Sequence, residues 1–240
     1  NNISPKTKMI IINSPHNPTG SIINEADIKI LEEITRNTGI LILSDEVYEH
    51  IVFDGEKHIS LSVSEELAER SFVIFSFGKT YHTTGWKLGY CTAPENLTNE
   101  LRKVHQFVVF SVNTPFQYAY ADFLDNEEHY LNLNNFYQKK RDIVLNLLHG
   151  TEFNFSPANG TYFQLLDYSK ISEMNDLEFA ELLTKEFGIA VIPLSPFYSK
   201  LYNDKIIRIC FAKRDEVLEE GMDRLKKAAE IILNNKPVTK

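Results

Sequence analysis

Short apolar runs alternate with a helical pattern through the first part of the chain. Four runs end in polar or turn residues, as strands of a parallel sheet do: 8–13, 39–43, 72–77 and 88–92. Between the first two, Asn24 can cap a helix from Glu25 to about Asn37, with Gly39 as its stop. The first run, KMIIIN, has the pattern of a strand buried on both faces. This order predicts an α/β domain with a mostly parallel sheet.

The second half of the chain has a different pattern. Helical spacing dominates from Asn99 to His149, interrupted at Asn113-Thr114-Pro115, and its last part predicts one long helix from about Glu127 to Leu148. After Gly150, short strand-like runs alternate with helices: runs at 161–168, 189–194 and 206–212, helices at about 175–187 and 214–234. We therefore expect a large domain over 1–126 and a smaller α+β domain over 127–240, entered through the long helix.

Aromatic residues are frequent in the helical middle of the chain. We interpret them as helix core and subunit interface rather than as a cofactor site: Phe107, Phe110, Phe116, Tyr118 and Tyr120. The chain begins Asn1-Asn2 without methionine and enters its first strand almost at once. We therefore expect it to be part of a longer protein, whose large domain is only partly contained in these residues.

Composition narrows the class of protein. The 240 residues carry a formal charge of -8 and contain no Lys/Arg-rich block, which argues against a nucleic-acid partner. No apolar stretch approaches the ~18 residues of a membrane span, so no membrane association is expected. Cys91 and Cys210 lie in apolar runs, which favours buried thiols over a disulfide and hence a reducing, cytoplasmic location.

Polar residues follow three of the predicted strands. Asn17 comes after the first, Asp45 and Tyr48 after the second, and Ser76 and Lys79 after the third. Because the carboxyl ends of parallel strands meet at one edge of a sheet, we expect these side chains to be neighbours. Viewed alone, Asp45 could be a cap and Lys79 a solvated loop residue.

Other chemical sites fit the sequence less well. The triplet Gly78-Lys79-Thr80 imitates the end of a nucleotide-binding loop, but that motif requires glycine where Val73 stands. The histidines show no metal-ligand spacing, so no metal is expected. Glu46 and Glu49 are interpreted as a solvated face or as ion-pair partners. A lysine for a Schiff base, an aspartate for a pyridinium nitrogen, and phenol and amide donors are what a pyridoxal phosphate site requires.

Four segments resemble the class I/II aminotransferases of pyridoxal phosphate fold type I: SPHNPTG (14–20), SDEVY (44–48), SFGKTYHTTGWKLGY (76–90) and RICFA (208–212). Within that family the chain is most similar to methionine- and kynurenine-type enzymes. The resemblance implies the following roles: Lys79 bonds the cofactor covalently, Asp45 pairs with its ring nitrogen, Asn17 and Tyr48 bond its 3-hydroxyl oxygen, Ser76 and Lys87 hold its phosphate, and Arg208 binds the substrate carboxylate.

Two of these assignments have alternatives. Many relatives carry arginine where Lys87 stands, and lysine lacks the bidentate fork, so the phosphate grip is expected to be looser; Lys87 could also be merely solvated. Arg208, in an apolar strand, could instead pair with Asp167. The resemblance also implies that the ring-stacking aromatic, the glycine-containing phosphate loop and the closing arm precede this chain.

The resemblance implies a homodimeric aminotransferase that moves an amino group from an L-amino acid, methionine or aromatic, to a 2-oxo acid by a ping-pong mechanism. A C–S β-lyase would use the same residues and would release pyruvate from cystathionine without an acceptor. A non-catalytic ligand-binding module is the third possibility, and it would tolerate loss of Lys79.

Overall fold

The computed structural model describes residues 2–200 and 202–234. Contacts divide the chain into two compact units: unit 1 comprises Asn1–His16 with Ser21–Asn134, and unit 2 comprises Asn17–Gly20 with Asn135–Lys240. Within the described residues, none of the helices has both the length and the apolar character needed to cross a bilayer.

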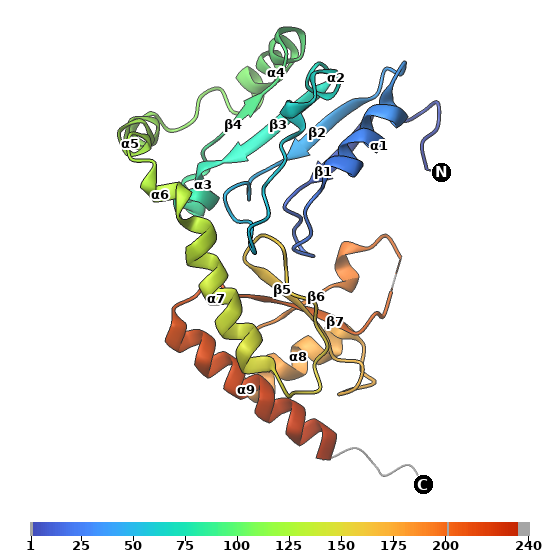
Figure 1. Ribbon diagram of the computed structural model, residues 1–240, viewed down its shortest axis with the longest axis vertical. Coiled ribbons are helices and arrows are strands. Elements are labelled where there is room, and N and C mark those ends of the chain that lie inside the picture. The colour runs from blue at the N-terminus through green and yellow to red at the C-terminus, as the bar shows by residue number, and fades with distance from the viewer. Residues whose placement is uncertain (1, 201, 235–240) are drawn as a thin grey trace. The chain divides into compact units, whose positions relative to one another are not determined.

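Unit 1 is built on a four-stranded sheet in the order β1-β2-β3-β4 (Figure 1). The strands are β1 (Met9–Asn13), β2 (Leu41–Asp45), β3 (Ser71–Ser76) and β4 (Gly89–Thr92). The pairs β1–β2 and β2–β3 are parallel, whereas β4 runs antiparallel to β3. The prediction of an α/β fold with a mostly parallel sheet is confirmed, and all four predicted strands are present.

Helix α1 (Glu25–Thr35) packs on this sheet. Asn24 caps it as predicted, forming a capping box with Asp27. The helix ends at Thr35, earlier than expected, because Arg36 leaves the helical conformation (ψ 135°) and Asn37, not Gly39, is the left-handed residue that follows (φ 57°). The buried cluster beneath it joins α1 to β2, η1 (Leu61–Val63) and α2 (Glu65–Ala68) through Ile28, Leu31, Ile42, Leu61 and Leu67.

The first strand is less buried than its apolar run indicates. Ile11 is 71% exposed, and the strand alternates between exposed and partly buried positions. Among the described residues β1 pairs only with β2 and so forms an edge of the sheet. The expectation of a strand buried on both faces is therefore wrong for these residues.

The helices of the middle segment are α4 (Glu95–Val108), α5 (Thr114–Leu124), α6 (Glu128–Leu131) and α7 (Leu133–Leu148). Asn113 caps α5, as the predicted break indicates, but the expected long helix is interrupted at Asn132. No residue of α4 is buried, and Phe107, Phe110 and Tyr118 are exposed. Helix core is thus the wrong interpretation for these three aromatics, and an interface role stays a prediction.

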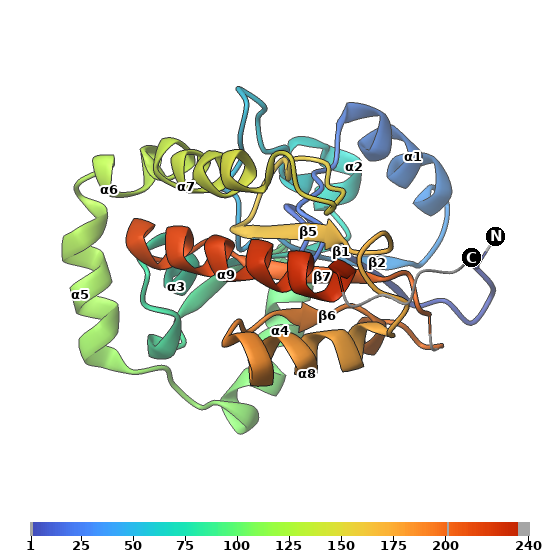
Figure 2. The ribbon, with the colours of Figure 1, turned by 90° about the horizontal axis from the view of Figure 1, so that it is seen from below.

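Unit 2 contains a three-stranded antiparallel sheet in the order β5-β7-β6 (Figure 2). Its elements are β5 (Phe163–Asp167), α8 (Asp176–Phe187), β6 (Ile192–Pro193), η3 (Ser195–Phe197), β7 (Ile206–Cys210) and α9 (Asp215–Asn234). Helix α8 packs against β6 and β7, and α9 packs against α8. This matches the predicted α+β pattern, although the run 189–194 forms only a two-residue strand.

Candidate active site

The turn after β2 carries Asp45 and Tyr48. Asp45 is the last residue of the strand. Its carbonyl accepts hydrogen bonds from Asn13 Nδ2 (2.9 Å), at the end of the neighbouring strand β1, and from the N of the next residue, Ser14 (3.1 Å). Its carboxylate oxygen Oδ1 accepts from Val47 N (3.3 Å). Tyr48 is only 3% exposed. Backbone bonds of the parallel sheet therefore fix where the turn begins.

Lys79 lies on the next strand-to-helix connection. The short helix α3 (Phe77–Thr80) starts directly after β3, and its last turn contains Lys79. Lys79 Nζ lies 5.8 Å from the centroid of the Tyr48 ring. The structure thus brings Asp45, Tyr48 and Lys79 together within unit 1, as the strand-end argument predicts.

Burial and charge act in opposite directions on Asp45. Burial raises the pKa of this carboxyl above its ordinary value, while the bond from Val47 N and the positive charge of Lys79 partly lower it. A carboxylate held this way gains from a further cationic hydrogen-bond donor, which would replace the hydration it has lost. Asp45 therefore fits a partner such as a protonated ring nitrogen.

Gly78 makes the connection around Lys79 possible. A Cβ built on Gly78 would lie 2.8 Å from Thr84 Cα, so the residue must be glycine for the chain to pass close to itself. The close neighbour of Gly78 is thus the backbone of the segment that returns after α3. That segment forms η2 (Thr84–Trp86).

Ser76 and Lys87 lie at the same end of the sheet. Ser76 of β3 pairs in register with Gly89 of β4, and Lys87 lies two residues before Gly89. The Ser76 side chain makes no capping bond to α3. Lys87 is exposed and takes a left-handed conformation (φ 58°). Both side chains are of the kind that binds a phosphate, by hydroxyl and by ammonium donors.

Asn17 and Arg208 belong to unit 2, where they meet. Arg208 Nη1 donates to Asn17 Oδ1 at 2.5 Å, and the guanidinium lies 4.1 Å from the centroid of the Phe163 ring. In the sheet register Arg208 stands opposite Leu165, whereas Asp167 stands opposite Ile206. No bond between Arg208 and Asp167 is seen, so the alternative ion pair receives no support. The predicted grouping of Asn17 with Asp45 stays a prediction.

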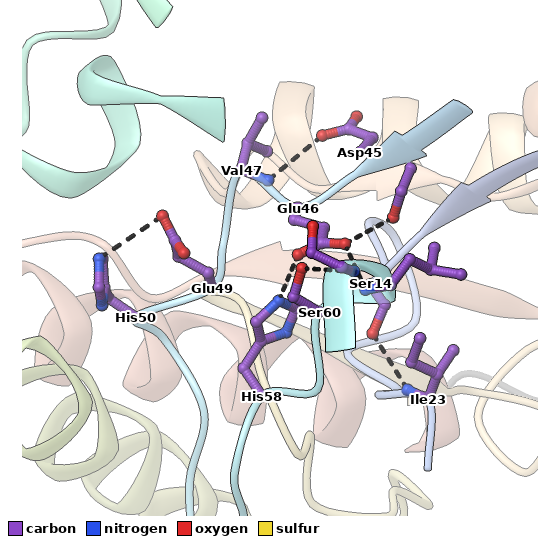
Figure 3. A network of polar contacts seen from close by, with 12 residues as sticks. Ser14, Ile23, Asp45, Glu46, Val47, Glu49, His50, His58 and Ser60 are labelled. Atoms are coloured by element: carbon purple, nitrogen blue, oxygen red, sulfur yellow. Dashed lines mark hydrogen bonds and ion pairs between the residues drawn. The ribbon is translucent and has the colours of Figure 1, made fainter. Parts of the chain in front are cut away.

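A buried polar network beside Asp45 escaped the sequence interpretation. Glu46 is 1% exposed, and its carboxylate contacts Ser44 Oγ (2.8 Å), Leu61 N (3.0 Å) and His58 Nε2 (2.8 Å) (Figure 3). The expectation of a solvated face is therefore wrong for Glu46, whose buried carboxylate instead pairs with His58. One signal was available: Ile42, Ser44 and Glu46 continue the alternation of β2 toward its buried face.

Glu49 and His50, on the same turn, border a pocket of about 260 Å³ in unit 1 that is otherwise lined by Phe75, Ser76, Phe77, Thr80, Tyr81, Tyr90, Leu124 and Tyr130. Burial raises the pKa of Glu49 to about 7, with the Glu46 charge adding to the rise and His58 opposing it. Burial likewise lowers the pKa of His50. Although Glu49 and His50 lie 3.5 Å apart, burial favours the neutral form of each, so the contact is weak as an ion pair.

Comparisons with known proteins agree with this geometry. Residues 1–225 match the family model of aminotransferase class I and II. A methionine aminotransferase of Escherichia coli is 47% identical over 225 residues, which cover 93% of this chain and 58% of the relative. A kynurenine–oxoglutarate transaminase of Dictyostelium discoideum is 35% identical and covers 92% of this chain and 57% of its own length.

Solved structures give the same result for the fold. A methionine aminotransferase structure from E. coli superposes with a TM-score of 0.91 at 47% identity, covering 94% of this chain and 59% of the other. An N-succinyldiaminopimelate aminotransferase from Mycobacterium tuberculosis gives a TM-score of 0.90 at 33% identity, with the same coverage of both chains. The fold is that of the aminotransferases. The chain belongs to the aminotransferase class I and II family. It spans about 58% of the length of the E. coli relative.

Proposed function

We propose that the whole protein is a pyridoxal 5'-phosphate-dependent aminotransferase. It would move the amino group of an L-amino acid to a 2-oxo acid, in a ping-pong sequence. The observation that supports this best is the position of Lys79, beside Tyr48 and close enough to Asp45 to act on its charge, in a chain of this family. Membership of the family favours the cofactor, whose bound ring withdraws electrons from the substrate Cα.

The residues of unit 1 would hold the cofactor and move the proton. Lys79 Nζ would be the point where the cofactor is attached, and its free amine would be the base that takes the proton from the substrate Cα. Asp45 would accept a hydrogen bond from the ring nitrogen and keep it protonated, and Tyr48 would donate to the ring oxygen. Ser76 and Lys87 would hold the phosphate, the lysine as a point charge without a bidentate fork.

In unit 2, Arg208 would bind the substrate α-carboxylate. Its planar guanidinium has several donors, and the Phe163 ring at 4.1 Å holds its plane. Asn17, now bonded to Arg208 through Oδ1, would use its amide group toward the ring oxygen. We assign methionine or aromatic amino acids as the donor because the methionine-type relative shares 47% of the matched residues. We further propose a cytoplasmic homodimer.

The test is the full-length protein with Lys79→Ala, assayed for amino-group exchange between L-methionine and a 2-oxo acid. We expect exchange to fall by at least about 10²–10⁴-fold, and the visible absorbance of the covalently attached cofactor to vanish. Lys29→Ala, an exposed lysine on α1, is the matched control and should behave as the unchanged protein. Undiminished exchange by Lys79→Ala would refute the assignment, and release of pyruvate from cystathionine without an acceptor would indicate the lyase.

A further inference from the structure

Glu46 is placed to hold the turn that carries Asp45 and Tyr48. It follows Asp45 directly, and because side chains alternate along extended backbone, the two carboxylates point to opposite sides (Figure 3). Oε1 of Glu46 accepts from Ser44 Oγ and Leu61 N, while Oε2 meets His58 Nε2. With 1% exposure and both oxygens engaged, Glu46 cannot reach a substrate. Its effect must be exerted through the chain.

The backbone of Glu46 makes hydrogen bonds both to the neighbouring strand and within the turn. Glu46 N donates to the Ile74 carbonyl of β3 at 2.9 Å, and Glu49 N donates to the Glu46 carbonyl at 3.0 Å. The next bond, from Ile51 N to the Tyr48 carbonyl at 2.8 Å, continues the turn. A shift of Glu46 would therefore move Asp45, one residue before it, and Tyr48, two residues after it.

His58 is the partner that makes a buried carboxylate tolerable at this point. Its side chain is 11% exposed and comes from the irregular segment that leads into η1. Burial alone would raise the pKa of Glu46, but the bonds from His58, Leu61 and Ser44 outweigh it and hold the pKa below its ordinary value. Removing one partner of such a buried pair leaves a charge without compensation, whereas removing both is much milder.

We propose that the Glu46–His58 pair positions Asp45 and Tyr48 for catalysis, acting through the backbone of the turn and not by contact with substrate or cofactor. The bonds of the turn given above all lie within unit 1. The consequence for catalysis rests on the proposed function, which gives Asp45 and Tyr48 their roles.

Four variants of the full-length protein test the pair. His58→Ala leaves Glu46 buried and unpaired, while the double variant Glu46→Gln/His58→Ala removes the charge as well. His58→Gln keeps a donor for Glu46 Oε2 and is the conservative rescue. Glu56→Gln changes an exposed acid of the same loop and is the control.

Two measurements separate positioning from general stability. Amide hydrogen exchange of residues 45–51, without added cofactor, reports the turn itself, with α8 (Asp176–Phe187) of unit 2 as internal reference. We expect about tenfold faster exchange in His58→Ala at 45–51 and no change in α8. For amino-group exchange we expect kcat to fall by up to about 100-fold with KM for the amino acid nearly unchanged, because a displaced turn misplaces reacting groups.

The double variant is decisive. If the pair acts as proposed, Glu46→Gln/His58→Ala recovers part of both losses relative to His58→Ala, and His58→Gln recovers most of them. Should His58→Ala fail to fold, recovery of folding in the double variant gives the same support. Two results would overturn the proposal. One is unchanged amide hydrogen exchange of residues 45–51 in His58→Ala. The other is a double variant whose hydrogen exchange and kcat are as impaired as those of His58→Ala. If the amide hydrogen exchange differences are seen but the unchanged protein transfers no amino group, only the proposed function is contradicted.

Discussion

Replacing Glu49 with glutamine should stabilise the protein, and the gain should depend on pH. Burial raises the pKa of Glu49 from 4.5 to about 7 in the folded chain. That difference corresponds to a cost of at most about 3 kcal/mol when the carboxyl is ionised, and the 23% exposure of its side chain reduces the expectation to about 1–2 kcal/mol. His50, whose pKa burial lowers, is neutral near pH 7 and does not compensate the charge.

The direction in which stability changes with pH follows from proton binding to Glu49. Between pH 4.5 and about 7 the folded state keeps a proton on Glu49 that the unfolded chain has released, so the free energy of unfolding falls as pH rises through this range. Above about pH 7 this loss of stability is complete, and below pH 4.5 it is absent. Glutamine imitates the neutral carboxyl at every pH. The stability difference between Glu49→Gln and the unchanged protein should therefore be near zero at pH 4 and largest at pH 8.

Urea denaturation of the full-length protein, followed by circular dichroism from pH 4 to 8.5, measures this difference. Glu56→Gln, in an exposed position of the same segment, supplies the baseline and should give a flat profile. A Glu49→Gln variant that is less stable at pH 8, or whose stability difference does not change with pH, would refute the burial of an unfavourable charge at this position.

Two further predictions concern the connection around Lys79 and the carboxylate site. Gly78→Ala should destabilise the protein by about 1–3 kcal/mol and weaken cofactor binding, because its Cβ would meet backbone at Thr84 Cα. Gly85→Ala, with nothing within 4 Å of its Cβ, should leave urea stability nearly unchanged, and equal effects of both would contradict the close approach. Arg208→Lys keeps the charge but loses the planar fork, so KM for the amino acid should rise about tenfold or more with a smaller change in kcat. An unchanged KM would remove Arg208 from the substrate site.

The elements that hold the candidate site follow from local patterns. Strands β1 to β4 and helix α1 were predicted from apolar runs and from the Asn24 cap, because these signals act between residues a few positions apart. Parallel pairing then placed Asp45 and Lys79 at neighbouring strand ends, and in the structure the charge of Lys79 acts on the Asp45 carboxyl. The family, too, was recognisable from four short segments, and the comparison over residues 1–225 confirms it.

Tertiary structure decided which polar and aromatic residues are buried and what they contact. Phe107, on α4, and Phe110, just after that helix, lie in an apolar stretch and yet are exposed. Gly78 is needed for the returning backbone, a neighbour that its own sequence context does not reveal.

The partners of the charged residues are likewise not evident from the sequence. Arg208 meets Asn17, 191 positions away, rather than the nearby Asp167, and Glu46 meets His58 across an irregular loop. Sequence periodicity determines which face of an element a residue occupies. The partner on that face is set by segments distant along the chain, and only the folded structure brings these together.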